Sequence, residues 1–151
     1  MHKEKVYMKR LFFMLISIVS ITFANDINLN ELVVEAKKTN KHILVYLHTP
    51  GCNYCLNMEE FTFDDEMVIS AIKKDFIFVD MNVKDEGLVS FDSVKVSKLK
   101  FAKEIGYPMY PSCLFFDQNG ELVYDGVGYR DENRFLEILK FVSSKSYDDV
   151  E

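Results

Sequence analysis

Apolar residues follow two different spacings along the chain, and the spacing changes several times. Continuous apolar runs at residues 43–48 and 76–81 are typical of buried strands. Apolar residues spaced three and four apart, as in residues 28–40 and 131–144, are typical of amphipathic helices. The predicted order is helix, strand, helix, strand, helix, strand, strand, helix, at about 28–40, 43–48, 52–61, 76–81, 97–105, 112–117, 121–125 and 131–144.

Several residues set the expected limits of these elements. Asn28 and Ser97 are expected to cap helices at their first turn, and Asp64 or Asp65 to cap a further helical piece before the second strand. Gly106 is expected to end a helix in a left-handed conformation. Residues 84–95 are polar and rich in turn-forming residues, so we expect them to be the least regular part of the domain.

The element order predicts an α/β fold. A helix between successive strands favours parallel crossovers, whereas the last two strands, joined by a short turn at Gln118-Asn119-Gly120, are expected to pair as a hairpin. The result is a four-stranded mixed sheet flanked by helices on both faces.

The ends of the chain differ from this domain. Residues 1–24 combine a basic start with an apolar stretch from Leu11 to Phe23 and end in Ala24, the pattern of a signal peptide. The stretch is short for a permanent membrane span, and an uncleaved signal anchor is the alternative. We therefore expect a signal peptide or anchor at 1–24, a domain at 25–145 and a flexible tail at 146–151.

The charge balance excludes one class of function. Without residues 1–24 the chain has 14 Lys and Arg against 23 Asp and Glu, a formal net charge of −9. Such a surface repels phosphate backbones, so we expect no nucleic-acid partner.

A pair of cysteines carries the candidate chemistry. Cys52 and Cys55 lie where the strand at 43–48 gives way to a helix, and the free N–H groups and dipole of a helix start stabilise a thiolate. A structural disulfide or half of a metal site is the alternative reading. Zinc usually takes four ligands, and neither a second cysteine pair nor a nearby histidine pair is present, so no metal site is predicted.

Other residues near the pair are expected to tune it. Asn53 and Tyr54 lie between the cysteines, and Tyr54 is also a candidate contact for substrates. His48, four residues before Cys52, either places an imidazolium near the thiolate or is a hydrogen-bonded histidine at a strand end. His42 is expected at the surface. Cys113 is expected to be a buried small apolar residue, with an alternative disulfide to Cys52 or Cys55 as the competing idea.

Taken together, these motifs resemble the thioredoxin-like superfamily, and within it exported proteins of the SoxW type. The resemblance covers nearly all of residues 28–144. The residues that carry it are Thr49-Pro50-Gly51-Cys52-Asn53-Tyr54-Cys55, Ala102-Lys103-Glu104-Ile105-Gly106-Tyr107, Tyr110-Pro111-Ser112 and Phe115-Phe116-Asp117-Gln118-Asn119-Gly120.

The resemblance implies roles for these residues. Cys52 is the nucleophile and Cys55 the resolving thiol, while Pro111 is a cis-proline that offers its backbone to an extended substrate, with Tyr110 shaping partner choice. Three features of many family members are absent: a buried acid at the position of Tyr46, a tryptophan at the position of Gly51, and a proline between the cysteines.

The function predicted is that of an exported, periplasmic thiol–disulfide oxidoreductase acting in the reducing direction. It needs no cofactor beyond the Cys52–Cys55 disulfide, and its expected partners are protein thiols and disulfides and a membrane thiol electron donor. We expect a monomer. Because two thiolates suffice to hold a soft metal, a copper-binding or copper-delivery module is the alternative.

Overall fold

The computed structural model describes residues 25–149. The predicted signal peptide or anchor at 1–24 lies outside the described residues, as do residues 150–151. Within the described part, no helix is both long and apolar enough to cross a membrane.

The main sheet has strand β2 near its centre. Its order is β3-β2-β6-β7, with β2 parallel to β3, antiparallel to β6, and β6 antiparallel to β7. These strands are β2 (His42–His48), β3 (Phe76–Asn82), β6 (Ser112–Phe116) and β7 (Leu122–Val127). The predicted four-stranded mixed sheet is confirmed.

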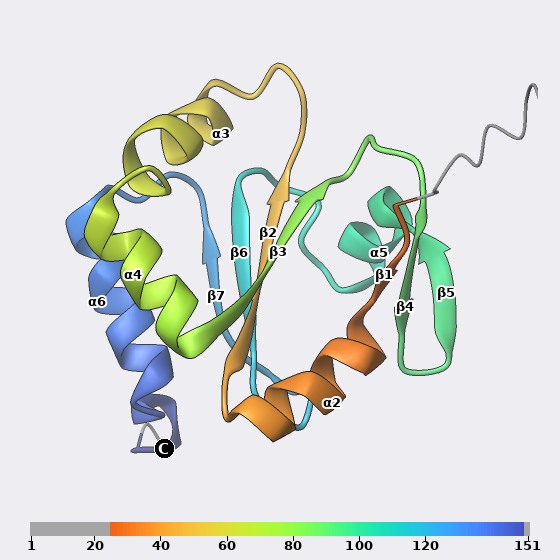
Figure 1. Cartoon of the computed structure of the whole chain (residues 1–151). Helices are drawn as coiled ribbons and strands as arrows, with labels where there is room; N and C mark the ends of the chain where they lie inside the picture. The colour runs from red at the N-terminus through yellow and green to blue at the C-terminus, as the bar shows by residue number, and fades with distance from the viewer. Residues whose placement is uncertain (1–24, 150–151) are drawn as a thin grey trace, which may run out of the picture.

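Helices cover both faces of this sheet (Figure 1). One face carries α2 (Leu29–Thr39) and α5 (Lys98–Glu104), and the other carries α4 (Glu66–Asp75) and α6 (Glu132–Ser143). Alternate residues of β2 divide between the two apolar clusters: Ile43, Val45 and Leu47 in one, Leu44 and Tyr46 in the other. Because β2 is buried on both faces, its sequence is continuously apolar instead of alternating.

The predicted caps are present. Asn28 accepts a hydrogen bond from the Glu31 N–H at the start of α2, and Ser97 accepts one from the Lys100 N–H at the start of α5. Asp65 accepts from two backbone N–H groups at the start of α4. Gly106 follows α5 with a φ of +93°, the left-handed conformation expected there.

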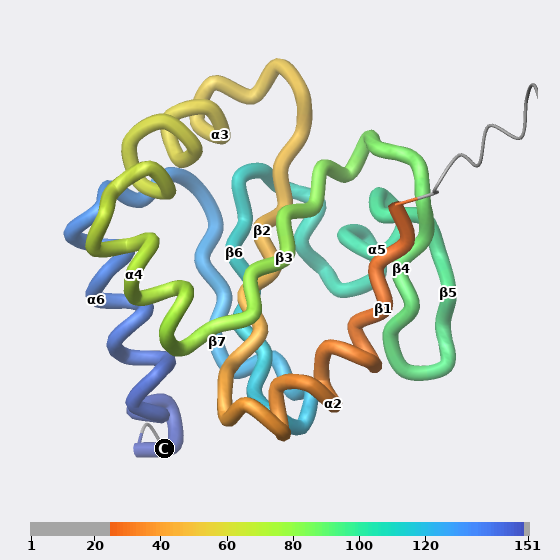
Figure 2. Tube along the Cα trace, viewed as in Figure 1, coloured from red at the N-terminus to blue at the C-terminus, as the bar shows by residue number. Residues whose placement is uncertain are grey.

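The prediction that residues 84–95 are irregular is wrong. They contain most of a hairpin, β4 (Leu88–Phe91) and β5 (Val94–Ser97), which forms a second sheet with β1 (Ile27–Asn28). Figure 2 shows the chain turning back on itself between β4 and β5, beside the start of the domain. Contacts distant in sequence hold it: Asn30 exchanges two hydrogen bonds with the Asp92 backbone, and the Asp26 carboxylate accepts from the Leu88 N–H.

Two further expectations need correction. His42 is not a surface residue: it is 2% exposed, and its Nε2 lies 2.8 Å from the hydroxyl of Tyr147. Tyr147 belongs to a 3₁₀ helix, η2 (Ser146–Asp149), in the segment expected to be a flexible tail. The histidine is buried because a residue 105 positions away covers it and pairs with its ring.

Candidate redox site

The candidate site lies where β2 ends. Helix α3 (Asn53–Asn57) begins there and continues without a break into a π-helix, η1 (Met58–Thr62). The start of β6 lies beside the end of β2, because Leu47 pairs with Ser112 in the antiparallel register. This register places the Tyr110-Pro111 loop at the same end of the sheet as the cysteine pair (Figure 1).

Cys52 and Cys55 form a disulfide. Their sulfurs are 2.14 Å apart and their Cα atoms 5.2 Å apart. Cys55 is 2% exposed, whereas Cys52 is partly exposed. An incoming protein therefore reaches the sulfur of Cys52 before that of Cys55.

Cys52 occupies the N-cap position of α3. Its Sγ accepts a hydrogen bond from the Cys55 backbone N–H at 3.1 Å, and its carbonyl oxygen accepts the first backbone bonds of the helix. Donors at a helix start stabilise negative charge on the capping atom. When the disulfide is reduced, the same N–H stabilises a thiolate on Cys52 in preference to Cys55.

The Tyr110–Pro111 peptide bond is cis, the geometry that the resemblance implied. The Pro111 carbonyl oxygen accepts a hydrogen bond from the Gly128 N–H at 2.8 Å, and the Ser112 hydroxyl donates to the Met109 carbonyl at 2.6 Å. The first bond holds the loop between α5 and β6 against the residues that follow β7, and the second lies within the loop itself.

Apolar packing sets the position of Tyr110, the residue expected to shape partner choice. Its side chain is half-buried against the α2–α5 cluster, and its hydroxyl is buried without a hydrogen-bond partner in residues 25–149. Burial raises the pKa of this hydroxyl. The apolar side chain exposed at this loop is that of its neighbour, Met109, which is 54% exposed.

The two residues between the cysteines face solvent. Tyr54 is 65% exposed, and Asn53 is exposed as well. Gly51, which precedes Cys52, has a φ of +76°, a conformation strained for any residue with a side chain. A tryptophan at this position would therefore be strained in this backbone, although a Cβ there would meet no neighbouring atom.

Tyr46 takes the place of the buried acid of many thioredoxins. It is 1% exposed, and its hydroxyl donates a hydrogen bond to the Cys55 carbonyl at 3.2 Å. Burial, together with the charge of Glu59, raises the pKa of this hydroxyl well above its ordinary value. Tyr46 therefore holds the backbone of Cys55 in place but does not accept a proton from its thiol.

A pocket of about 210 Å³ borders the disulfide. His48, Cys52, Cys55 and Glu59 line it, whereas Tyr54, Tyr110 and Pro111 do not. His48 contacts a carboxylate on each side of its ring: Nδ1 lies 3.4 Å from Glu59 Oε1, and Nε2 lies 2.7 Å from Asp80 Oδ1. The Asp80 contact is an ion pair that lacks the alignment of a hydrogen bond.

These contacts determine the charge of His48. Burial alone lowers the pKa of the imidazole, but the contact with Asp80 and the charges of Asp80 and Glu59 outweigh burial and raise it. His48 is therefore a paired histidine at a strand end that also lines the pocket of the cysteine pair, and its effect on the Cys52 thiolate stays a prediction.

The third cysteine is not part of the disulfide. Cys113 is free and buried, in register with Tyr46 across the β2–β6 pair. Burial raises the pKa of its thiol to about 12. The prediction of a buried small apolar residue is confirmed.

The thioredoxin-like domain family matches residues 29–143, most of the chain. The chain belongs to this family. Its fold is that of solved thioredoxin-like structures at low sequence identity, and among curated proteins none matches the sequence.

Three solved structures have folds similar to that of this thioredoxin-like domain. A thioredoxin-fold protein from Helicobacter pylori is 22% identical, with 72% of this chain and 73% of that chain covered and a TM-score of 0.63. A thioredoxin from Thermus thermophilus is 23% identical, with 83% and 91% covered and a TM-score of 0.63. The oxidised DsbD C-terminal domain of Neisseria meningitidis is 16% identical, with 74% and 90% covered and a TM-score of 0.55.

Three residues of this thioredoxin-like site were not predicted from the sequence: Glu59, Asp80 and Met109. Glu59 had a signal in the sequence, because it lies four residues after Cys55 and therefore on the same helix face. Asp80 pairs in register with Tyr46 on the neighbouring strand, which local sequence does not reveal. Met109 is exposed while its neighbour Tyr110 packs against the α2–α5 cluster, a division that local sequence does not reveal.

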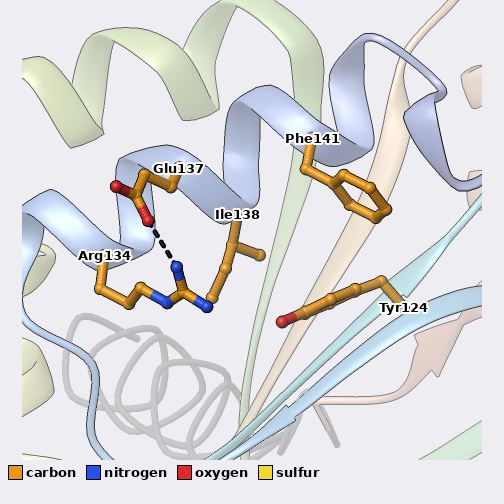
Figure 3. A pocket seen from close by; sticks show the side chains of 5 residues that line it. All are labelled: Tyr124, Arg134, Glu137, Ile138 and Phe141. Carbon is orange, nitrogen blue, oxygen red and sulfur yellow. Dashed lines mark hydrogen bonds and ion pairs between the residues drawn. The ribbon is translucent and has the colours of Figure 1, made fainter.

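Two other features bear on what the thioredoxin-like domain binds. In residues 25–149 no cluster of three or more His, Cys, Asp or Glu could hold a metal ion. A separate groove of about 370 Å³ lies between β7 and α6, lined by Tyr124, Arg134, Glu137, Ile138 and Phe141 (Figure 3). We assign no chemistry to this groove, because Arg134 and Glu137 pair with each other and none of the five residues lines the disulfide pocket.

Proposed function

We propose that this protein is a thiol–disulfide oxidoreductase that exchanges disulfides with protein thiols. The observation that carries the proposal is the Cys52–Cys55 disulfide at the start of α3, with the Cys52 sulfur bonded to a helix N–H. A partly exposed sulfur beside a buried one suits a nucleophile and a resolving thiol.

The reaction would proceed in two steps. In the reduced protein, the Cys52 thiolate attacks one sulfur of a substrate disulfide, which releases the other substrate sulfur as a thiolate and leaves a mixed disulfide. Cys55 then attacks Cys52, the Cys52–Cys55 bond forms again, and the second substrate sulfur leaves. Two electrons pass from the protein to the substrate. We propose that the exposed side chains of Tyr54 and Met109 contact the substrate chain, along with the backbone of Pro111.

We place the protein on the reducing side. A strong oxidant is one whose reduced, thiolate form is stabilised. The pocket beside the cysteines contains a carboxylate, Glu59, and a histidine paired with two carboxylates, but no lysine or arginine. With these charges, a Cys52 thiolate gains little stabilisation beyond that of the helix start. The disulfide form is therefore favoured, and the reduced protein tends to donate electrons.

We further propose that the domain acts outside the cytoplasm, as a monomer. The basic and apolar pattern of residues 1–24 supports export. In such a compartment the oxidised protein needs a source of electrons, for which we propose a membrane thiol donor. N-terminal sequencing of the protein recovered from the periplasm tests the export proposal: a start near Asn25 supports cleavage, whereas a cytoplasmic, full-length protein contradicts it.

Insulin reduction tests the oxidoreductase function directly. With dithiothreitol as the donor, the protein should accelerate insulin precipitation well above the dithiothreitol background, and a Cys52→Ser/Cys55→Ser variant should not. Copper analysis of the reduced protein separates the copper alternative. One copper bound per chain, with no acceleration of insulin reduction, would contradict the proposed function and favour metal delivery.

A further inference from the structure

Resolution of a mixed disulfide places a chemical demand on Cys55. Its thiol must lose a proton before it attacks, yet Cys55 is 2% exposed and burial disfavours a charged thiolate. The residue at the usual position of a buried proton acceptor is Tyr46, whose hydroxyl donates to the Cys55 carbonyl. The acceptor must therefore come from elsewhere in the site.

Glu59 has the position to supply it. It lies one helical turn after Cys55, on the same face, and lines the same pocket of about 210 Å³. Its side chain is 42% exposed, so a proton taken from the pocket can pass on to water. Its Oε1 lies 3.4 Å from His48 Nδ1, which draws the carboxylate towards the end of β2.

We propose that Glu59 accepts the Cys55 proton during resolution and that His48 is the positioning residue that holds Glu59 over the pocket. This inference rests on the proposed oxidoreductase function and adds a proton path to it.

The Cys55 S–H proton moves to the Glu59 carboxylate, and the Cys55 sulfur attacks the Cys52 sulfur of the mixed disulfide. The bond between Cys52 and the substrate sulfur breaks, and the Cys52–Cys55 bond forms. The substrate sulfur leaves as a thiolate and takes up a proton from Glu59 or from water.

The charged and titratable groups of this site come from several elements. Glu59 faces Tyr46 and His48 on β2 and the two cysteines that line the pocket. Asp80 on β3 and Asp85 after it act on His48, and Asp80 and Cys113 on β6 act on Tyr46. Because Asp80 and Glu59 raise the pKa of His48, the imidazole keeps a positive charge at higher pH than an ordinary histidine. Its attraction for the Glu59 carboxylate therefore persists in the range where exchange takes place.

The test follows the mixed disulfide itself. Reduced protein is mixed with excess oxidised glutathione, quenched with acid at short times, and resolved by mass spectrometry. The rise of the glutathionylated protein reports attack by Cys52, and its decay reports attack by Cys55. Each rate is measured from pH 6 to pH 8 for the wild type, Glu59→Gln, His48→Gln and Glu60→Gln.

With a proton acceptor in place, the decay rate of the wild type should change little with pH. In Glu59→Gln it should fall by about 100-fold at pH 7, near the lower end of general-base effects, with the rise rate changed less than about twofold. Since Cys55 must then ionise unaided, the decay rate should increase about tenfold per pH unit. His48→Gln should slow the decay by about threefold, a smaller effect expected of a residue that acts through another.

Glu60→Gln is the matched control, because it removes the same charge one residue further along the same exposed turn. It should decay like the wild type. Equal decay rates and pH slopes in Glu59→Gln and Glu60→Gln would overturn the assignment of Glu59, and a wild-type rate in His48→Gln would overturn that of His48. A wild type that oxidised glutathione does not convert to the Cys52–Cys55 disulfide would instead contradict the proposed function.

Discussion

Strand β2 has a histidine at each end, and the two lie in opposite environments. His42, at the start, is buried beside Phe76 and paired with the hydroxyl of Tyr147, and burial lowers the pKa of its imidazole. His48, at the end, lies between Glu59 and Asp80, and the contact with Asp80 and both charges outweigh burial and raise its pKa.

The difference shows how one strand serves two purposes. At the His42 end, aromatic side chains and a neutral histidine close the core. At the His48 end, charged groups and a partly exposed sulfur surround an open pocket. Changes at the first end should therefore affect stability, and changes at the second should affect chemistry.

The largest expected effect is at the chemical end. Cys52→Ser should reduce insulin turnover to the background rate, because serine cannot form the mixed disulfide. Cys113→Ala is the matched control: burial raises the pKa of Cys113 to about 12, so its removal should leave turnover within about twofold of the wild type. Loss of turnover in Cys113→Ala would show that the third thiol takes part.

The next effect is at the structural end. Phe76 is 3% exposed and packs against His42 and Phe115, so Phe76→Ala should lower the free energy of unfolding by about 3–5 kcal/mol. Tyr54→Ala, at the exposed site, should change it by less than about 0.5 kcal/mol. Urea denaturation measures both. Similar losses in the two variants would contradict the division between the ends of β2.

A smaller effect should follow from Tyr147→Phe. Without the hydroxyl, Nε2 of His42 is left buried without a partner, which should cost about 1–2 kcal/mol of unfolding free energy. Insulin turnover should not change, because the pair lies at the far end of β2. A variant as stable as the wild type would show that the tail does not stabilise the domain through this bond.

The smallest effect concerns pH, and its sign differs between the two histidines. The lowered pKa of His42 adds stability that is present above the unfolded-state pKa of about 6.5 and is lost as pH falls. The raised pKa of His48 adds stability that is present below about 6.5 and is lost as pH rises. NMR titration of the two imidazoles should place their midpoints on opposite sides of 6.5, and midpoints on the same side would contradict the comparison.

The sequence was sufficient where the decisive contacts are local. Cys52 and Cys55 could be placed because a strand, a break and a helix follow one another there, and Asn28, Asp65 and Ser97 because capping depends on a few neighbouring residues. The mixed four-stranded sheet followed from the order of the elements.

The sequence was insufficient where contacts are distant. The β4–β5 hairpin depends on Asp26 and Asn30, about 60 residues earlier, and the burial of His42 depends on Tyr147. The carboxylates around His48 come from a helix and a neighbouring strand, so their convergence required the fold. Local polarity alone predicted an irregular segment and an exposed histidine.

The reduction potential of the Cys52–Cys55 pair tests the central claim most directly. Equilibration with glutathione buffers, followed by thiol alkylation, should reveal a reversible two-electron couple. We predict a potential closer to the roughly −270 mV of thioredoxin than to the roughly −120 mV of strong periplasmic oxidants. A value near −120 mV would contradict the reducing direction, and a pair that never equilibrates with glutathione would contradict thiol–disulfide exchange itself.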